Sequence, residues 1–339
     1  MTPSLDQLSA GTLDWLGANL DHFDPYAADA GTATHQQAKA VLELALLHHC
    51  SARAGGPHDE RLGGATALLR KLWQRPEFPR LFDTHPPSAP TYGLACAALA
   101  PDGIDDTVCR ATLGRLTPGF LSPAGKSPLK RMEIRFYADK AGADHTIEPY
   151  AELVGQSPLV TLTAAAPGSA VTGDAATGGA ATGGAATGGA ATGGAASEGV
   201  APLTDSEGYS LTHAAFFLGD YGRTATGLDG DALAHARELV RLMLDHCVGQ
   251  DRWDLAAELV ITQFILGLEP LRTPSGAAAV ECLVRAQRSD GAIPGRSAAL
   301  MASRSAPAGE FFRKAYHTTL VAALMTLVVS SGRPSWHRA

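Results

Sequence analysis

The sequence has no CxxC pair, and its five cysteines are an odd number. It therefore does not offer the even, regularly spaced set that indicates a disulfide framework. Free cysteine is among the residue types most often buried in proteins. We expect buried, reduced thiols at all five positions, which are Cys50, Cys96, Cys109, Cys247 and Cys282.

A long apolar run is also missing. The longest apolar stretch near the C-terminus, residues 318–329, has about twelve residues, short of the roughly twenty that span a bilayer. Residues 1–20 lack the basic start, continuous apolar core and small-residue cleavage site of a secretory signal. We therefore expect a cytoplasmic protein with no membrane partner.

Charge of one sign is not concentrated anywhere in the chain. The formal net charge of -7 is modest for 339 residues, and Lys and Arg are scattered rather than gathered in a stripe. A nucleic-acid partner would require such a basic stripe, so we expect none. The 45% of hydrophobic residues suffices for one large helical domain or two smaller ones.

Apolar residues at helical spacing predict an all-α protein built of helical hairpins. Residues 131–138 depart from this pattern, because charged and apolar residues alternate there with a period of two, which predicts one short strand. Residues 151–163 fit either a short helix or an extended segment. The predicted helices are 12–20, 35–50, 59–74, 92–99, 105–116, 210–218, 231–248, 253–268, 277–287 and 310–329.

Residues 164–200 have almost nothing to bury. The unit Ala-Ala-Thr-Gly-Gly repeats between Ala175 and Ala195, and this composition is typical of a flexible, disordered linker. A five-residue period without apolar anchors cannot stack into a solenoid. The linker separates an N-terminal helical part, residues 1–163, from a C-terminal part, residues 201–339. The two parts are either separate units or portions of one toroid.

Three strongly apolar helices open with similar residues, at Thr34-His35, Thr212-His213 and Tyr316-His317. A more amphipathic helix separates each from the next. This alternation is expected when inner helices are covered by outer ones, as in a complete or incomplete α/α toroid. The starts of the inner helices would then converge, and their dipoles would favour an anionic ligand.

Convergence of these helices predicts a site of histidines and carboxylates. His213 lies in an apolar run, and Asp220 follows two turns later on the same face if the helix continues. Asp254 and Glu258 are four residues apart, so they project from one helix face. Such a set could supply a general acid and base. The predicted catalytic residues are His213, Asp254, Glu258 and His317, and the predicted substrate-binding residues are Tyr209, Asp220, Trp253 and Tyr316.

The same residues have simpler interpretations. Asp254 fits an acid that complements a helix dipole, with Glu258 facing solvent. His213 fits a core histidine bonded to a neighbouring Asp or Tyr, and Asp220 fits a turn. A further alternative is a zinc or non-haem iron site formed by His213, Asp254 and His317, although the chain has no HExxH-type spacing.

Several stretches resemble an actinobacterial family of helical proteins without an assigned function. They are residues 13–16 with 23–26, residues 211–222, and Trp253-Asp254-Leu255 with Glu258. The resemblance covers most of the chain outside the linker and residues 126–163, and it implies no catalytic residues.

The turn at residues 287–291, Gln-Arg-Ser-Asp-Gly, is similar to turns that link helical hairpins in terpenoid-cyclase-like α/α toroids. The DxDD and DDxxD acids of those enzymes are absent, and Asp105-Asp106 lacks their spacing. Their absence argues against cyclase or prenyl-transfer chemistry.

These observations lead us to expect an enzyme of specialised metabolism that acts on a small molecule or short peptide. The alternative is a non-catalytic helical-repeat protein that binds a peptide or partner protein in its concave mouth. Histidine and carboxylate side chains within hydrogen-bonding reach of each other would favour the enzyme. An open apolar groove would favour the binding protein.

Overall fold

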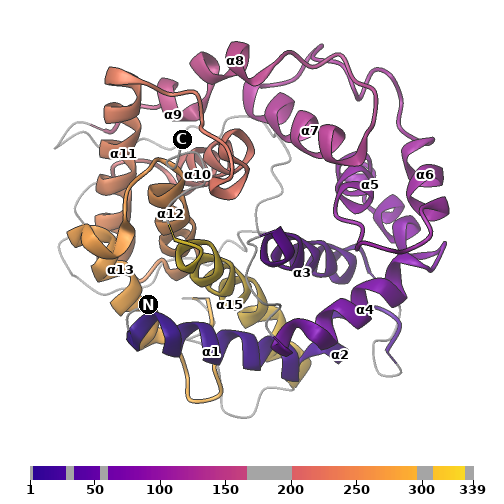
Figure 1. Cartoon of the computed structure of the whole chain (residues 1–339), viewed down its shortest axis with the longest axis horizontal. Helices are drawn as coiled ribbons and strands as arrows, with labels where there is room; N and C mark the ends of the chain where they lie inside the picture. Colours follow the sequence, from indigo (N-terminus) through magenta and orange to yellow (C-terminus); the bar gives the residue numbers. More distant parts are fainter. Residues whose placement is uncertain (1–2, 28–33, 54–59, 166–200, 296–307, 333–339) are drawn as a thin grey trace.

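Helices make up the regular structure of the described chain. The computed structural model describes residues 3–27, 34–53, 60–165, 201–295 and 308–332. Over these residues the chain forms α-helices and short 3-10 turns, with no strand (Figure 1). The all-α class is therefore confirmed. Most of the predicted linker, residues 166–200, lies outside the described residues.

Helices occur on both sides of that segment. Before it, the structure has α1 (Pro3–Ala18), α2 (Leu20–Phe23), α3 (His35–Arg53), α4 (Gly63–Trp73), α5 (Ala89–Ala98), α6 (Thr107–Leu113), α7 (Pro128–Ala141), α8 (Tyr150–Leu153) and α9 (Pro158–Thr161). After it come α10 (Asp205–Gly219), α11 (Gly230–Gly249), α12 (Trp253–Ile265), α13 (Pro274–Ala286) and α15 (Ala308–Ser330).

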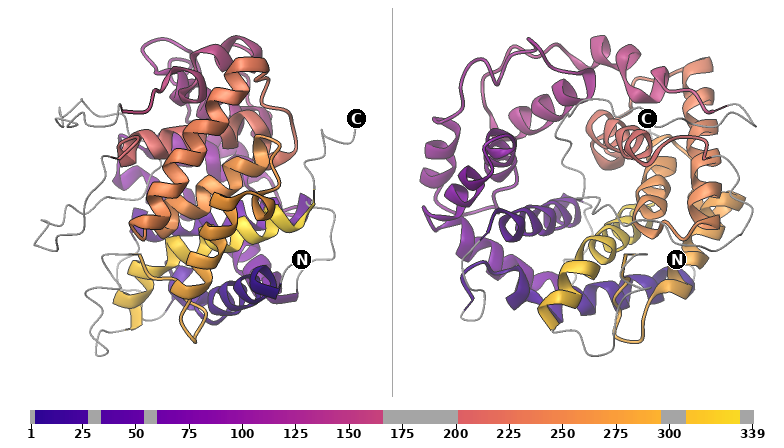
Figure 2. Two further views of the ribbon diagram at one scale, coloured as in Figure 1. Left: turned by 90° about the vertical axis from the view of Figure 1, so that its left-hand side faces the viewer. Right: turned by 180° about the vertical axis from the view of Figure 1, so that it is seen from behind.

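The helices form a two-layered ring. The inner layer runs α3, α5, α7, α10, α12 and α15, where each helix contacts the next and α15 contacts α3. Helices α1, α4, α6, α11 and α13 lie outside it, as the views from the front and from behind show (Figures 1 and 2). Inner and outer helices alternate along most of the chain. Helices from the two sides of segment 166–200 contact each other directly, α3 with α15 and α7 with α10.

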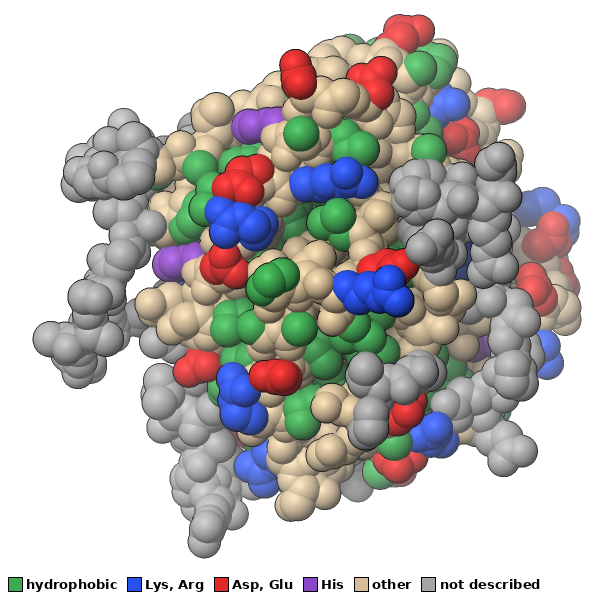
Figure 3. All heavy atoms as spheres, turned by 60° about the vertical axis from the view of Figure 1, so that its left-hand side comes forward, with side chains coloured by type: hydrophobic (Ala, Val, Ile, Leu, Met, Phe, Trp, Pro, Cys, Tyr) green, Lys and Arg blue, Asp and Glu red, His purple; other side chains and the backbone are tan. Residues whose placement is uncertain are grey.

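Burial distinguishes the two layers. Every residue of inner helix α12 from Leu255 to Ile265 is buried. Outer helix α11 instead exposes one face, where Arg241 pairs with Glu238 and Asp245. Acidic and basic side chains are interspersed on this side of the molecule (Figure 3). A helix that is apolar all round packs inside, and an amphipathic one covers it.

The predicted strand at residues 131–138 is wrong, because these residues lie within helix α7. Ser127 caps the helix by accepting a hydrogen bond from the Lys130 amide, Pro128 occupies the first turn, and Gly142 ends it in the left-handed region, with φ 63°. Helix α7 packs against α5, α8 and α10. A helix covered on several sides carries apolar residues on several faces, so its sequence shows no single 3.6-residue stripe.

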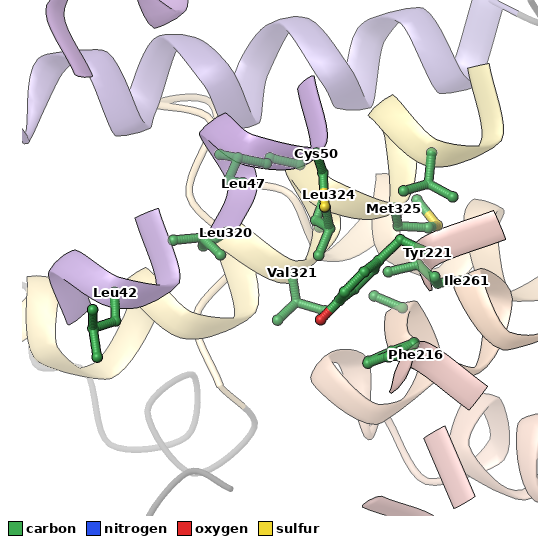
Figure 4. Packing of buried hydrophobic residues seen from close by; sticks show 14 of the residues in the cluster. Leu42, Leu47, Cys50, Phe216, Tyr221, Ile261, Leu320, Val321, Leu324 and Met325 are labelled. Carbon is green, nitrogen blue, oxygen red and sulfur yellow. The ribbon is translucent and has the colours of Figure 1, made fainter. Parts of the chain in front are cut away.

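An apolar layer lies in the middle and C-terminal turns of four inner helices. It includes Leu47 of α3, Phe216 of α10, Ile261 of α12 and Val321 of α15, with the ring of Tyr221 among them (Figure 4). All five cysteines are buried free thiols, as the sequence predicted. No described helix is long and apolar enough to cross a membrane.

Helix α10 begins with a reciprocal capping box. The Thr204 hydroxyl accepts a hydrogen bond from the Glu207 amide, and the Glu207 carboxylate accepts one from the Thr204 amide. We expect Thr204→Ala to lower the free energy of unfolding by about 1 kcal/mol, measured by urea denaturation. Ser206→Ala, at an exposed position in the same turn, is the control and should leave stability unchanged; equal losses in the two variants would contradict the capping role.

Candidate functional site

The polar residues inside the ring come from the N-terminal and middle turns of four inner helices. They are Lys39 and Glu43 of α3, His213 of α10, Glu258 of α12 and His317 of α15, and we call this set the central polar site. One helical turn after Glu43, His213, Glu258 and His317, the same four helices contribute to the apolar layer. The site is therefore bounded on one side by a low-dielectric core.

One half of the site is a charged triad of Lys39, Glu43 and His317. The Glu43 carboxylate lies 3.1 Å from Lys39 Nζ and 3.0 Å from His317 Nδ1. Burial disfavours the charged form of all three side chains, but the attraction between their opposite charges outweighs this effect. It lowers the pKa of Glu43 to about 2 and raises the pKa of His317 to about 9. At neutral pH the triad therefore has two cations and one anion.

The other half pairs Glu258 with His213. Their closest atoms, Glu258 Oε2 and His213 Nε2, lie 3.8 Å apart, and the Thr212 hydroxyl donates a 2.5 Å hydrogen bond to the same carboxylate oxygen. Burial raises the pKa of Glu258 to about 7, although Thr212 and His317 oppose it. Burial, helped by the charges of His317 and Lys39, lowers the pKa of His213 to about 4. Near pH 7 the carboxyl group can thus gain or lose a proton beside a neutral imidazole.

The two halves act on each other electrostatically. The charge of His317 shifts the pKa of both His213 and Glu258 downward. The side chains also remain partly accessible, with exposed fractions of 27% for His317, 17% for Glu43 and 14% for His213. A small solute can therefore reach groups whose protonation is set by their neighbours.

Tyr209 and Asp254 form a hydrogen-bonded pair beside the central polar site. The Tyr209 hydroxyl donates to Asp254 Oδ2, and its ring lies 6.3 Å from the His213 ring, measured between centroids. Burial and the negative charge of Asp254 raise the pKa of Tyr209, which keeps the phenol protonated as a donor. Asp254 is thus bound to Tyr209 rather than placed directly against either histidine.

Asp220 does not join the site, because the helix that carries His213 does not continue through it. Helix α10 ends at Gly219, and Asp220 and Tyr221 both adopt left-handed backbone conformations, with φ 42° and 54°. The Asp220 carboxylate pairs with Lys140 at 2.8 Å and Arg223 at 3.4 Å. A β-carbon on Gly219 would lie 2.3 Å from the Ile265 side chain, so this close approach requires glycine at the end of the helix.

Two further predicted substrate-binding residues are packed into apolar surroundings. Tyr316 stacks on Phe312 at 5.3 Å and meets Phe23 edge-on at 6.0 Å, measured between ring centroids. Trp253, at the start of α12, packs partly buried against the hydrophobic core. The structure therefore brings His213, Glu258 and His317 together, with Asp254 nearby through Tyr209, and gives Tyr316 and Trp253 supporting positions.

Sequence reasoning missed Lys39 and Glu43. They are four residues apart on α3, and such a pair normally indicates a solvated helix face. The available signal was their position, because the residues around them, from Ala38 to Leu47, are otherwise all apolar. On α5 and α7, Lys130 similarly bonds the Thr91 hydroxyl at 2.6 Å and the Glu133 carboxylate at 2.7 Å, which adds a further polar group inside the ring.

The predicted metal ligands do not form a metal site. Within the described residues, no group of three or more His, Cys, Asp or Glu side chains is arranged to hold a metal ion. Zinc or iron binding requires ligand atoms about 2.0–2.2 Å from a common point. His213 Nε2 and Glu258 Oε2, 3.8 Å apart, are too far apart for a direct hydrogen bond, so a proton would pass between them through a water molecule or a bound solute.

Fold and site together define a class of all-α proteins, in which a two-layered ring of helices surrounds a buried set of histidines and carboxylates. The chain belongs to the family described as Domain of unknown function (DUF6895), whose family model matches residues 9–177 and 183–327. No curated protein and no solved structure matches the chain.

Proposed function

We propose that this protein is a cytoplasmic α/α toroid enzyme of specialised metabolism that transfers a proton to or from a small molecule or short peptide. Glu258 is the proton-exchanging group. His213 is its neutral partner, and His317 provides a positive charge opposite them. The Tyr209 hydroxyl, which donates its hydrogen to Asp254, offers its oxygen as a hydrogen-bond acceptor beside the pair.

The observation that supports the proposal best is the environment of Glu258. This carboxyl group is only 5% exposed, is bonded by Thr212 and lies 3.8 Å from His213. Its pKa of about 7 matches the pH at which a general acid or base is most effective. A carboxylate on a solvated surface would be ionised at this pH and would be a poor proton donor.

The closed ring of inner helices supports the proposal of an α/α toroid. The free cysteines support the proposal of a cytoplasmic protein. Five free thiols are typical of a reducing environment, in which disulfides do not persist. The partial exposure of the polar side chains favours a small ligand over a large partner surface.

Deuterium exchange tests the proposed proton transfer. The purified protein is incubated in D2O with pools of metabolites and short peptides, and mass spectrometry follows deuterium uptake and product formation. We expect at least one compound to react, at a rate that changes with pH near 7. Glu258→Gln should slow this reaction by roughly 100-fold, because general acid–base catalysis typically contributes at least this factor.

Glu238→Gln is the matched control, since it makes the same chemical change on the exposed face of α11. It should react at the wild-type rate. Equal rates for wild type and Glu258→Gln, with both proteins folded, would contradict the role of Glu258. A protein inert toward all pools would favour the binding alternative.

A further inference from the structure

One ring nitrogen of the His317 imidazolium is hydrogen-bonded within the protein, and the other can bind a ligand. Its Nδ1 is bonded to Glu43 at 3.0 Å. No described residue forms a hydrogen bond with Nε2, and this atom is not among the buried polar atoms that lack a partner. With 27% of its side chain exposed, His317 can therefore donate through Nε2 to a ligand inside the ring.

The triad around His317 has an excess of positive charge while Glu258 is protonated. Lys39 and His317 share a single carboxylate, Glu43, so the triad has a net charge of about +1 at neutral pH. His213 stays neutral there, and Glu258, the other carboxyl group that faces His317, carries no charge while it is protonated. Lys130 and Glu133 compensate each other on α7.

We propose that the central polar site binds a small oxyanion, the carboxylate or phosphate group of the substrate, at His317 Nε2, with the Lys39 ammonium as a second positive charge nearby. This inference rests on the proposed function, because it names the substrate class of the same site. His317 on α15 donates through Nε2, and Lys39 on α3, whose ammonium lies 3.1 Å from Glu43, adds a second positive charge. While Glu258 is protonated, a neutral substrate would leave the excess positive charge of this partly buried site unpaired, which is unfavourable.

Oxyanion binding and the protonation of Glu258 are coupled. His317 on α15 is faced by Lys39 and Glu43 of α3, by Glu258 of α12 and by His213 of α10. Glu258 is itself faced by Thr212, His317, Asp254 and Glu43. An anion near His317 repels ionised Glu258, so it binds best when that carboxyl group is protonated.

Sulfate is a suitable probe, because it remains a dianion between pH 5 and 9. Histidine imidazole resonances are followed by NMR while sodium sulfate replaces sodium chloride at constant ionic strength. We expect a saturable shift of the His317 resonances at pH 6 and an affinity about tenfold lower at pH 8. In Glu258→Gln the affinity should be at least as high, and its change between pH 6 and pH 8 should disappear.

His317→Gln, followed through the His213 resonances, should weaken sulfate binding at least tenfold, and Lys39→Met provides a second test if that variant does not fold. The matched control is His145→Gln, which removes a histidine paired with Asp139 at 2.8 Å on α7 and should bind sulfate normally. Parallel titrations with acetate and phosphate distinguish a carboxylate ligand from a phosphoryl ligand.

Three results would overturn the proposal. They are no saturable shift with any of the anions, unchanged affinity in a folded His317→Gln or Lys39→Met variant, and an equal loss in His145→Gln. Failure of the proton-transfer proposal is distinguishable, because sulfate binding would then persist while Glu258→Gln left every reaction unchanged.

Discussion

Replacing Glu43 by glutamine is expected to lower the pKa of His317 from about 9 to below 6.5, a change of more than 100-fold in its protonation equilibrium. Burial and the charge of Lys39 both disfavour the imidazolium, and Glu43 is the main group that outweighs them. Without its charge, these two effects prevail, so His317 becomes neutral at pH 7. NMR titration of the imidazole resonances measures the pKa directly.

Lys39→Gln is the matched control, because it removes a positive charge from the triad where Glu43→Gln removes a negative one. Removal of the Lys39 charge takes away a repulsion, so the pKa of His317 should rise rather than fall. A fall in both variants would indicate general disruption of the site. An unchanged pKa in Glu43→Gln would show that Glu43 does not hold the proton on His317.

The helical architecture was predictable, because burial leaves a clear trace in the sequence. Helix α12 is apolar all round and α11 is amphipathic, so their places inside and outside the ring follow from how apolar residues are distributed around each helix. Helix α7 shows the limit of this argument. Its buried faces include Glu133, and a polar residue among apolar ones produced a false period of two.

The site was predictable only in part. His213, Glu258 and His317 stood out as ionisable residues in apolar helices, which is a local signal. Glu43 meets His317 across 274 positions of sequence, and nothing in one sequence indicates that contact. The prediction that Asp220 joins the site did not allow for the end of α10. Two consecutive residues there adopt the left-handed backbone conformation, which non-glycine residues seldom adopt.

The turn at residues 287–291 and the residues just after it hold α1, α13 and α15 together. The Gln287 amide donates to the carbonyls of Leu8 and Gly291, each at 3.2 Å. Just beyond the turn, the Ile293 amide donates to the Thr319 hydroxyl at 2.9 Å. Gly291 lies against the backbone of Gly11 with φ 92°, and an added β-carbon would come within 2.0 Å of the Gly11 carbonyl oxygen.

Gly291→Ala is therefore expected to lower the free energy of unfolding by about 3 kcal/mol, measured by urea denaturation. Forcing a methyl group against packed backbone costs about 1–3 kcal/mol, and the left-handed conformation adds about 1–2 kcal/mol. Gly103→Ala isolates the second contribution, because Gly103 has φ 76° and no atom within 4 Å of an added β-carbon. Its loss should be about 1 kcal/mol. Equal losses in the two variants would show that the contact between α1 and this turn does not help to close the ring.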